Sequence, residues 1–184
     1  MLDLGCSGGG MVLDAVLRGH FAIGLEGSDA SLRELRAEWR LLDSNLLTCD
    51  ITKPFTILDK SINKPYCFDI ITAWEVLEHI NSQDLPQLFE NIKRHLASNG
   101  YFMGSIANWN DIDTKTGTNW HVTTQPYEWW KSIFEMNGFV VCTSEISVFD
   151  LPRGGYNPPL FYEVPYNEID TKRNFYIVAR KKQL

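Results

Sequence analysis

The sequence contains no apolar run of the roughly 18 residues that a membrane-spanning helix requires, and no signal peptide opens it. It also has few cysteines: Cys6, Cys49, Cys67 and Cys142 are far apart and form no C-x-x-C pair. Neither a zinc site nor a disulfide framework is therefore indicated. This cysteine usage is typical of a reducing compartment, so we expect a cytoplasmic protein that does not bind membranes.

The chain lacks an excess of basic residues. Its 17 Lys and Arg residues are outnumbered by 23 Asp and Glu residues, which gives a net charge of −6. Because binding to a phosphate backbone requires a basic surface, the charge argues against nucleic acid as a partner. A basic cluster within residues 172–182 is interpreted as a solvated face.

Length and composition predict one α/β domain over residues 1–184. Hydrophobic residues make up 44% of the chain and charged residues 22%, which are ordinary values for a globular protein with a core. Apolar strand-like runs alternate with helical patterns over short links, which predicts a parallel sheet with right-handed crossovers. The expected helices include 28–42 and 85–96, and the expected strands include 68–73 and 139–146.

The first ten residues, MLDLGCSGGG, form the most informative segment. A short apolar strand carries Asp3 and is followed by a Gly-rich turn that leads into a helix. Glycines there allow positive φ and let a ligand approach the backbone, and the helix directs free N–H groups at the turn. The pattern predicts a nucleotide-like ligand, and an acid two residues before Gly5 indicates that this ligand carries positive charge. No Lys-Ser or Lys-Thr pair follows the glycines, which argues against a P-loop, whereas a dinucleotide-binding fold also fits.

Three further acids each end an apolar strand-like run. Glu26 closes HFAIGLE, Asp50 closes LLTCD and Glu75 closes FDIITAWE. In open α/β sheets, ligands bind outside the carboxyl ends of the strands. Glu26 is therefore placed to accept hydrogen bonds from both hydroxyls of a ribose, and Asp50 from an adenine amine. The alternative is that each acid merely caps the helix that follows it.

With these segments in this order, the chain resembles the class I S-adenosylmethionine-dependent methyltransferases over nearly its full length. Residues 3–9 are similar to the first motif of that family, with Ser7 in place of the middle glycine. Residues 68–80, 95–108 and 121–139 are similar to its fourth strand, its fifth strand and the helix before its sixth strand. The resemblance implies a Rossmann-like, doubly wound, mainly parallel sheet of seven strands in the order 3-2-1-4-5-7-6, with the last strand antiparallel.

The same resemblance implies S-adenosyl-L-methionine as the cofactor. The residues it assigns to cofactor binding are Asp3, Gly5, Cys6, Ser7, Gly8, Gly9, Glu26, Gly27, Ser28, Asp50, Ile51 and Trp74. Within this set, Trp74 is expected near the sulfur, since an aromatic face suits a sulfonium cation. The alternative for Trp74 is core packing at the end of a strand.

The four histidines include two candidates for the acceptor side. His79 lies in EVLEH beside the expected cofactor site, and His121 follows the fifth strand, where relatives that act on sugars, amines and quinone precursors often place a histidine. We therefore expect His121 and His79 to be catalytic, with His121 as the general base for a hydroxyl acceptor. The alternative for His121 is a hydrogen-bonded loop residue.

Glu75, Glu78, His79 and His121 also form a set of two carboxylates and two imidazoles. The E-x-x-E-H pattern resembles the metal-binding segment of small-RNA 2′-O-methyltransferases and of some quinone-pathway O-methyltransferases, in which a divalent ion would acidify acceptor hydroxyls. Glu75 and Glu78 equally suit the start of a helix. We expect no metal here.

The expected function is methylation of oxygen or nitrogen on a small-molecule acceptor by a monomer or homodimer. The alternatives are a metal-assisted 2′-O-methyltransferase acting on RNA and a non-catalytic, cofactor-binding partner subunit. The first strand begins at Met1, so we expect a domain truncated at the N-terminus. Residues 149–173, which contain several prolines and aromatics, are predicted to form a lid loop over the acceptor together with residues 107–125.

Overall fold

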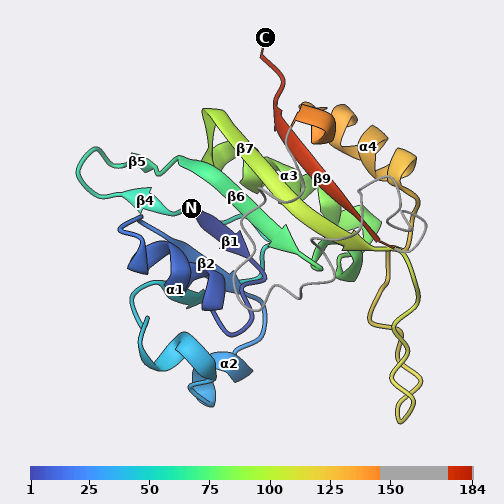
Figure 1. The fold of residues 1–184 in the computed structure, drawn as a ribbon, viewed down its shortest axis with the longest axis horizontal. Helices are drawn as coiled ribbons and strands as arrows, with labels where there is room; N and C mark the ends of the chain where they lie inside the picture. Colours follow the sequence, from blue (N-terminus) through green and yellow to red (C-terminus); the bar gives the residue numbers. More distant parts are fainter. Residues whose placement is uncertain (146–173, 184) are drawn as a thin grey trace.

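A computed structural model describes residues 1–145 and 174–183 and centres on a seven-stranded sheet (Figure 1). The strands lie in the order β3-β2-β1-β6-β7-β9-β8. Their bounds are β1 Leu2–Leu4, β2 Ile23–Glu26, β3 Leu46–Thr48, β6 Phe68–Trp74, β7 Leu96–Ala107, β8 Phe139–Val141 and β9 Asn174–Lys181. Strands β4 (Leu58–Asp59) and β5 (Lys64–Pro65) form a separate hairpin. When this hairpin is left out of the numbering, the order is the predicted 3-2-1-4-5-7-6.

Strand direction also agrees with the prediction. Five neighbouring strands are parallel to one another, namely β3, β2, β1, β6 and β7. Strand β9 is antiparallel to both β7 and β8. The predicted strand over residues 68–73 is present as β6. Its side chains alternate little between apolar and polar, as expected for a central strand that is covered on both faces.

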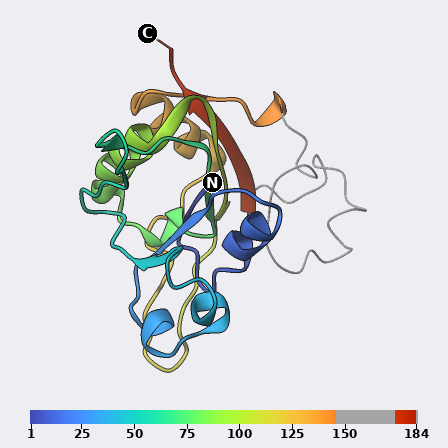
Figure 2. The same cartoon turned by 90° about the vertical axis from the view of Figure 1, so that its left-hand side faces the viewer.

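The α-helices within residues 1–145 and 174–183 are α1 Gly10–Leu17, α2 Ala30–Arg33, α3 Leu85–His95 and α4 Tyr127–Met136. Helices α3 and α4 cover one face and α1 covers the other (Figures 1 and 2), which is the doubly wound arrangement. The helix α3 forms because Leu85, Leu88, Phe89 and Ile92 place a continuous buried stripe on the sheet. None of the described helices is long and apolar enough to cross a membrane.

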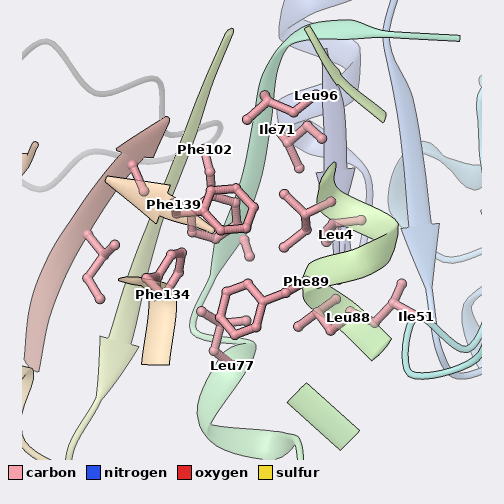
Figure 3. Close-up of a cluster of buried hydrophobic side chains, with 14 of the residues drawn as sticks. Leu4, Ile51, Ile71, Leu77, Leu88, Phe89, Leu96, Phe102, Phe134 and Phe139 are labelled. Carbon is pink, nitrogen blue, oxygen red and sulfur yellow. The ribbon is translucent and has the colours of Figure 1, made fainter. Parts of the chain in front are cut away.

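The main core lies between the sheet and helices α3 and α4 (Figure 3). Phe89 of α3 and Phe134 of α4 meet edge to face, with their ring centroids 4.7 Å apart. Phe102 of β7 packs against Phe134 from the sheet at 5.2 Å. Each of these rings is fully buried, and burying such a side chain contributes about 1.5–3 kcal/mol.

The predicted helix over residues 28–42 is wrong. Only α2 is α-helical there, and Leu35, with a φ of 49°, breaks the helix before a 3-10 turn at Ala37–Arg40. The reason is a tertiary contact: the indole N–H of Trp39 donates to the carbonyl of Ser7 at 2.8 Å.

Two other predicted boundaries also move. Helix α3 ends at His95, and Leu96 already pairs with Phe68, so the helix ends before Asn99. Strand β8 ends at Val141 and is followed by a 3-10 turn, Thr143–Glu145, where a longer strand was expected. The predicted lid loop over 149–173 lies outside the described residues.

Candidate functional site

The Gly-rich turn connects β1 to α1 at the carboxyl ends of the parallel strands. The backbone N–H groups of Gly5 and Cys6 both donate to the carbonyl of Leu25, at 2.7 and 3.0 Å. Ser7 has a φ of 48°, and Gly9 precedes α1 with a φ of 88°. The turn is therefore held to strand β2 and opens toward solvent at Ser7, which is exposed.

Protein packing itself requires two of the glycines. A Cβ on Gly5 would lie 2.5 Å from Cγ2 of Val76, and a Cβ on Gly9 would lie 2.5 Å from Cδ1 of Leu46. Both glycines also have positive φ, as predicted. In contrast, a Cβ on Gly10 would meet nothing within 4 Å. The contact with Val76 joins the turn to the EVLEH segment.

Asp3 is a buried acid on the central strand β1. Its Oδ1 accepts a hydrogen bond of 2.7 Å from the hydroxyl of Thr72, its partner on β6. Burial, with a smaller contribution from the charge of Glu26, raises the pKa of Asp3 to about 7. A cationic group bound nearby would favour the ionised carboxylate. Sequence reasoning missed Thr72, because the register that pairs it with Asp3 is not visible in the sequence.

Glu26, at the end of β2, is held by two backbone groups. Its carboxylate accepts hydrogen bonds from the N–H of Ser7 at 2.8 Å and from the N–H of Ser28 at 3.1 Å. A carboxylate has about four lone-pair sites, so acceptor capacity is left for two ribose hydroxyls. Gly27 leaves open space beside it, since a Cβ there would meet nothing within 4 Å.

Asp50 and Ile51 follow β3 in a turn that α3 holds in place. The Oδ1 of Asp50 accepts hydrogen bonds from the N–H and the hydroxyl of Thr52, which hold the pKa of Asp50 below its usual value. Ile51 is buried in the main core. The side-chain amide of Asn91 donates to the carbonyls of Ile51 and Lys53, at 2.9 and 2.8 Å.

Two more side chains of α3 hold the segment that follows. Arg94 donates to the carbonyl of Phe55 at 2.9 Å. The buried His95 accepts a hydrogen bond from the N–H of Ile57 and pairs through Nδ1 with the carbonyl of Tyr66. Burial lowers the pKa of His95, in keeping with a neutral structural imidazole.

Trp74 and Cys6 differ in exposure. Trp74 is half-buried; its indole N–H donates to the sulfur of Met11 at 3.0 Å, and its ring meets Tyr176 edge to face. An aromatic ring thus lies at the end of β6. Cys6 is buried, and burial raises the pKa of its thiol to about 12, so it supplies backbone to the turn and no nucleophile.

After β7 the chain leaves the body of the protein as an extended two-stranded excursion, residues 108–122, which we call the arm (Figure 1). Ile112 and Asn119 pair across it, and the N–H of Trp120 donates to the carbonyl of Asp111. The arm returns to the body at His121, which is buried.

The structure brings His79 and His121 together at the base of the arm. Their rings meet edge to face, with centroids 4.7 Å apart. The Nδ1 of His79 pairs with the carbonyl of Trp120 at 2.9 Å, and the Nδ1 of His121 pairs with the carbonyl of Trp109 at 2.6 Å. Because a carbonyl only accepts, each Nδ1 is the donor, and each neutral ring keeps its lone pair on Nε2.

Glu78 lies beside the two histidines and is completely buried. Burial, together with the neighbouring charge of Glu75, raises its pKa to about 8. One ligand atom from each of Glu78, His79 and His121 lies within 4.8 Å of the others, so these three residues can hold a metal ion. Glu75, the fourth member of the set seen in the sequence, is outside that group, and its φ of 54° marks a strained turn after β6.

The sheet has seven strands with an antiparallel β9, and a Gly-rich turn follows its first strand. Acids lie on β1, at the end of β2 and in the segment after β3. Together these features define a class I S-adenosylmethionine-dependent methyltransferase. The chain belongs to the methyltransferase domain family, whose model matches residues 1–148. It is therefore an enzyme of this class, with S-adenosylmethionine as its cofactor.

Solved structures share the fold at low sequence identity. The PH0226 protein from Pyrococcus horikoshii OT3 is 16% identical with a TM-score of 0.63, over 98% of this chain and 81% of that one. An S-adenosylmethionine-dependent methyltransferase from Clostridium acetobutylicum is 14% identical with a TM-score of 0.64, over 99% and 83%. The glycopeptide N-methyltransferase MtfA, complexed with S-adenosylmethionine, is 14% identical with a TM-score of 0.61, over 99% and 81%. A comparison with curated proteins found no significant match.

Proposed function

We propose that this methyltransferase acts on an oxygen or nitrogen of a small-molecule acceptor and that His121 accepts the acceptor's proton, with His79 beside it. The observation that carries the proposal is the path of residues 75–79. Val76 packs against Gly5 of the Gly-rich turn, while His79 contacts His121 at the base of the arm. One short segment thus joins the cofactor turn to the histidine pair.

Three acids are proposed to hold the cofactor. Asp3 faces its ammonium group, Glu26 its ribose hydroxyls, and Asp50 with Ile51 its adenine. The donor set suits this ligand, because Glu26 keeps free acceptor sites and the buried Asp3 gains from a nearby cation. S-adenosylmethionine supplies, when bound, a methyl group made electrophilic by a positively charged sulfur.

His121 suits proton transfer better than His79 does. His121 is 6% exposed, whereas His79 is exposed, so the imidazole of His121 is better shielded from bulk water. Its Nδ1 is fixed to the carbonyl of Trp109, which leaves Nε2 as the basic atom. When a methyl group is transferred from sulfur to an acceptor hydroxyl, leaving S-adenosylhomocysteine, Nε2 of His121 would take the proton that the hydroxyl loses. An amine acceptor loses its proton to the same atom.

The net charge of −6 favours a small acceptor over a nucleic acid. The acceptor is to be found by incubating pools of hydroxylated and amino compounds with the protein and measuring S-adenosylhomocysteine formation. With the acceptor in hand, His121→Ala should lower kcat by roughly 10²–10⁴-fold while S-adenosylhomocysteine affinity stays unchanged. The exposed His20 offers a control, and His20→Ala should behave as the parent. Full activity in His121→Ala would contradict the assignment of the base.

A second candidate is metal-assisted methylation of a ribose 2′-hydroxyl at an RNA end. The grouping of Glu78, His79 and His121 within 4.8 Å favours it. A divalent ion there would acidify the hydroxyl directly and would make both histidines ligands. The acidic charge of the chain weighs against RNA, so we place this function second.

A further inference from the structure

Glu78 contacts both ends of the arm. Its Oε1 accepts a hydrogen bond of 2.9 Å from the N–H of Ala107, where β7 ends and the arm begins. Its backbone carbonyl accepts hydrogen bonds, both of 2.9 Å, from the N–H groups of Val122 and Thr123, where the arm returns. A single residue thus closes the base of the arm.

The arm in turn fixes the two imidazoles. Its backbone supplies the carbonyls of Trp109 and Trp120, which receive the Nδ1–H groups of His121 and His79. These two carbonyls lie on opposite sides of the arm, one on the outgoing and one on the returning segment. The directions of both rings therefore depend on how the base of the arm is closed.

Keeping a carboxyl group at this place costs free energy. Glu78 is 0% exposed, and its side chain shares a hydrogen bond with that of Glu75. Burying a carboxyl group costs free energy that an apolar side chain of the same size would avoid. The cost indicates that the bond from Oε1 to Ala107 has a role beyond filling space.

We propose that Glu78 is a positioning residue, which closes the arm through Ala107 and thereby orients His121 and His79 toward the acceptor. The inference rests on the proposed function for the role of the histidines. Its main readout, the state of the two rings, is independent of turnover. A failure of the acceptor assignment can therefore be distinguished from a failure of this inference.

The test compares Glu78→Gln with Glu78→Ala in the full chain, with S-adenosylhomocysteine as the bound probe. Glutamine keeps an oxygen that can accept from Ala107, and alanine does not. Histidine ¹⁵N NMR should show Nδ1-protonated rings for His79 and His121 in the parent and in Glu78→Gln. In Glu78→Ala the His121 signals should move to a mixture of tautomers. Turnover of Glu78→Ala should fall about 100-fold, which is the scale of a small misplacement of a reacting group. Its affinity for S-adenosylhomocysteine should be retained.

Ala107→Pro removes the donor and leaves Glu78 unchanged, so it provides the same test if Glu78→Ala does not fold. Unmoved histidine signals in these variants would overturn the proposal. Equal losses in Glu78→Gln and Glu78→Ala would also overturn it, because a neutral acceptor would then not suffice. Mn²⁺ binding to the parent, measured by electron paramagnetic resonance and lost in both variants, would identify a cation site in place of a positioning residue.

Discussion

The carboxylate of Glu26 accepts a hydrogen bond of 2.8 Å from the backbone N–H of Ser7, 19 residues earlier in the chain. This bond ties the exposed tip of the Gly-rich turn to the end of β2. A second bond, from the N–H of Ser28, holds the same carboxylate from the other side. Glu26 is therefore oriented by the backbone of both neighbouring loops before any ligand binds.

Glu26→Ala should weaken S-adenosylhomocysteine binding by about 1.5–3 kcal/mol, the scale of hydrogen bonds to a charged group. Isothermal titration calorimetry measures the loss, and NAD should not bind to the parent protein. Asp43→Ala is a matched control, because Asp43 is an exposed acid whose side chain accepts a hydrogen bond from its neighbour Ser44. Parent-like affinity in Glu26→Ala would contradict the proposal that Glu26 binds the ribose hydroxyls.

Gly5→Ala should destabilise the fold by about 1–3 kcal/mol, because the added Cβ would overlap Val76. Val76→Ala in the same chain should restore part of the loss, and the positive φ of Gly5 should keep the rest. Gly10→Ala, where the space is open, should leave the melting temperature unchanged or raise it. Urea unfolding of the parent, the three single variants and the double variant checks this, and additive effects at positions 5 and 76 would contradict it.

S-adenosylhomocysteine binding should strengthen with pH between 6 and 8. The pKa of Asp3 is about 7 without ligand, and the ammonium group of the ligand favours the ionised form. The gain should be about tenfold over these two pH units, as the ionised fraction of Asp3 rises. Thr72→Val removes the donor that stabilises the carboxylate, so its profile should shift to higher pH. A flat pH profile in the parent would contradict the proposal that Asp3 binds the ammonium group.

The free energy of unfolding should fall as the pH rises from about 4 to 7. The pKa of Asp3 is raised in the folded protein from its ordinary 3.8 to about 7, so its contribution is full below the lower value and is lost through the higher one. Asp3→Asn should flatten this part of the stability curve. Denaturant melts at several pH values measure it, and an unchanged slope in Asp3→Asn would show that Asp3 does not titrate in this range.

Turnover should be insensitive to chelators. Burial raises the pKa of Glu78 to about 8, and a protonated carboxyl is a poor metal ligand at neutral pH. The assay compares S-adenosylhomocysteine formation with and without EDTA. Activity that disappears with EDTA and returns with Mg²⁺ would instead support the metal-assisted alternative at Glu78, His79 and His121.

The positions of the acids were predictable because they follow from local patterns, whereas the strand order was implied by the resemblance to the methyltransferase family. Apolar runs that end in Asp3, Glu26 and Glu75 place these residues at the carboxyl edge of a parallel sheet whatever the details of packing. The same patterns failed at residues 28–42. There the helical spacing was real, but the indole of Trp39 bonds to Ser7, far away in the sequence, and this contact ends the helix.

The hydrogen bonds that orient the site were not predictable. Thr72 faces Asp3 only because β1 and β6 pair in one register, which neither sequence pattern specifies. The partners of His79 and His121 are backbone carbonyls of tryptophans, which carry no residue-type signal at all. Sequence therefore supplied the candidate residues, and the structure was needed to show what holds them.

Helix α3 has a consequence for ligand binding at a distance. Its residues Asn91, Arg94 and His95 hydrogen-bond to the backbone after Asp50, so the segment beside the proposed adenine contacts is anchored to the last turns of the helix. Ligand occupancy and helix order are then linked equilibria, and each must stabilise the other by the same free energy. A substitution such as Asn91→Ala would thus lower cofactor affinity, although Asn91 is not one of the proposed ligand-binding residues.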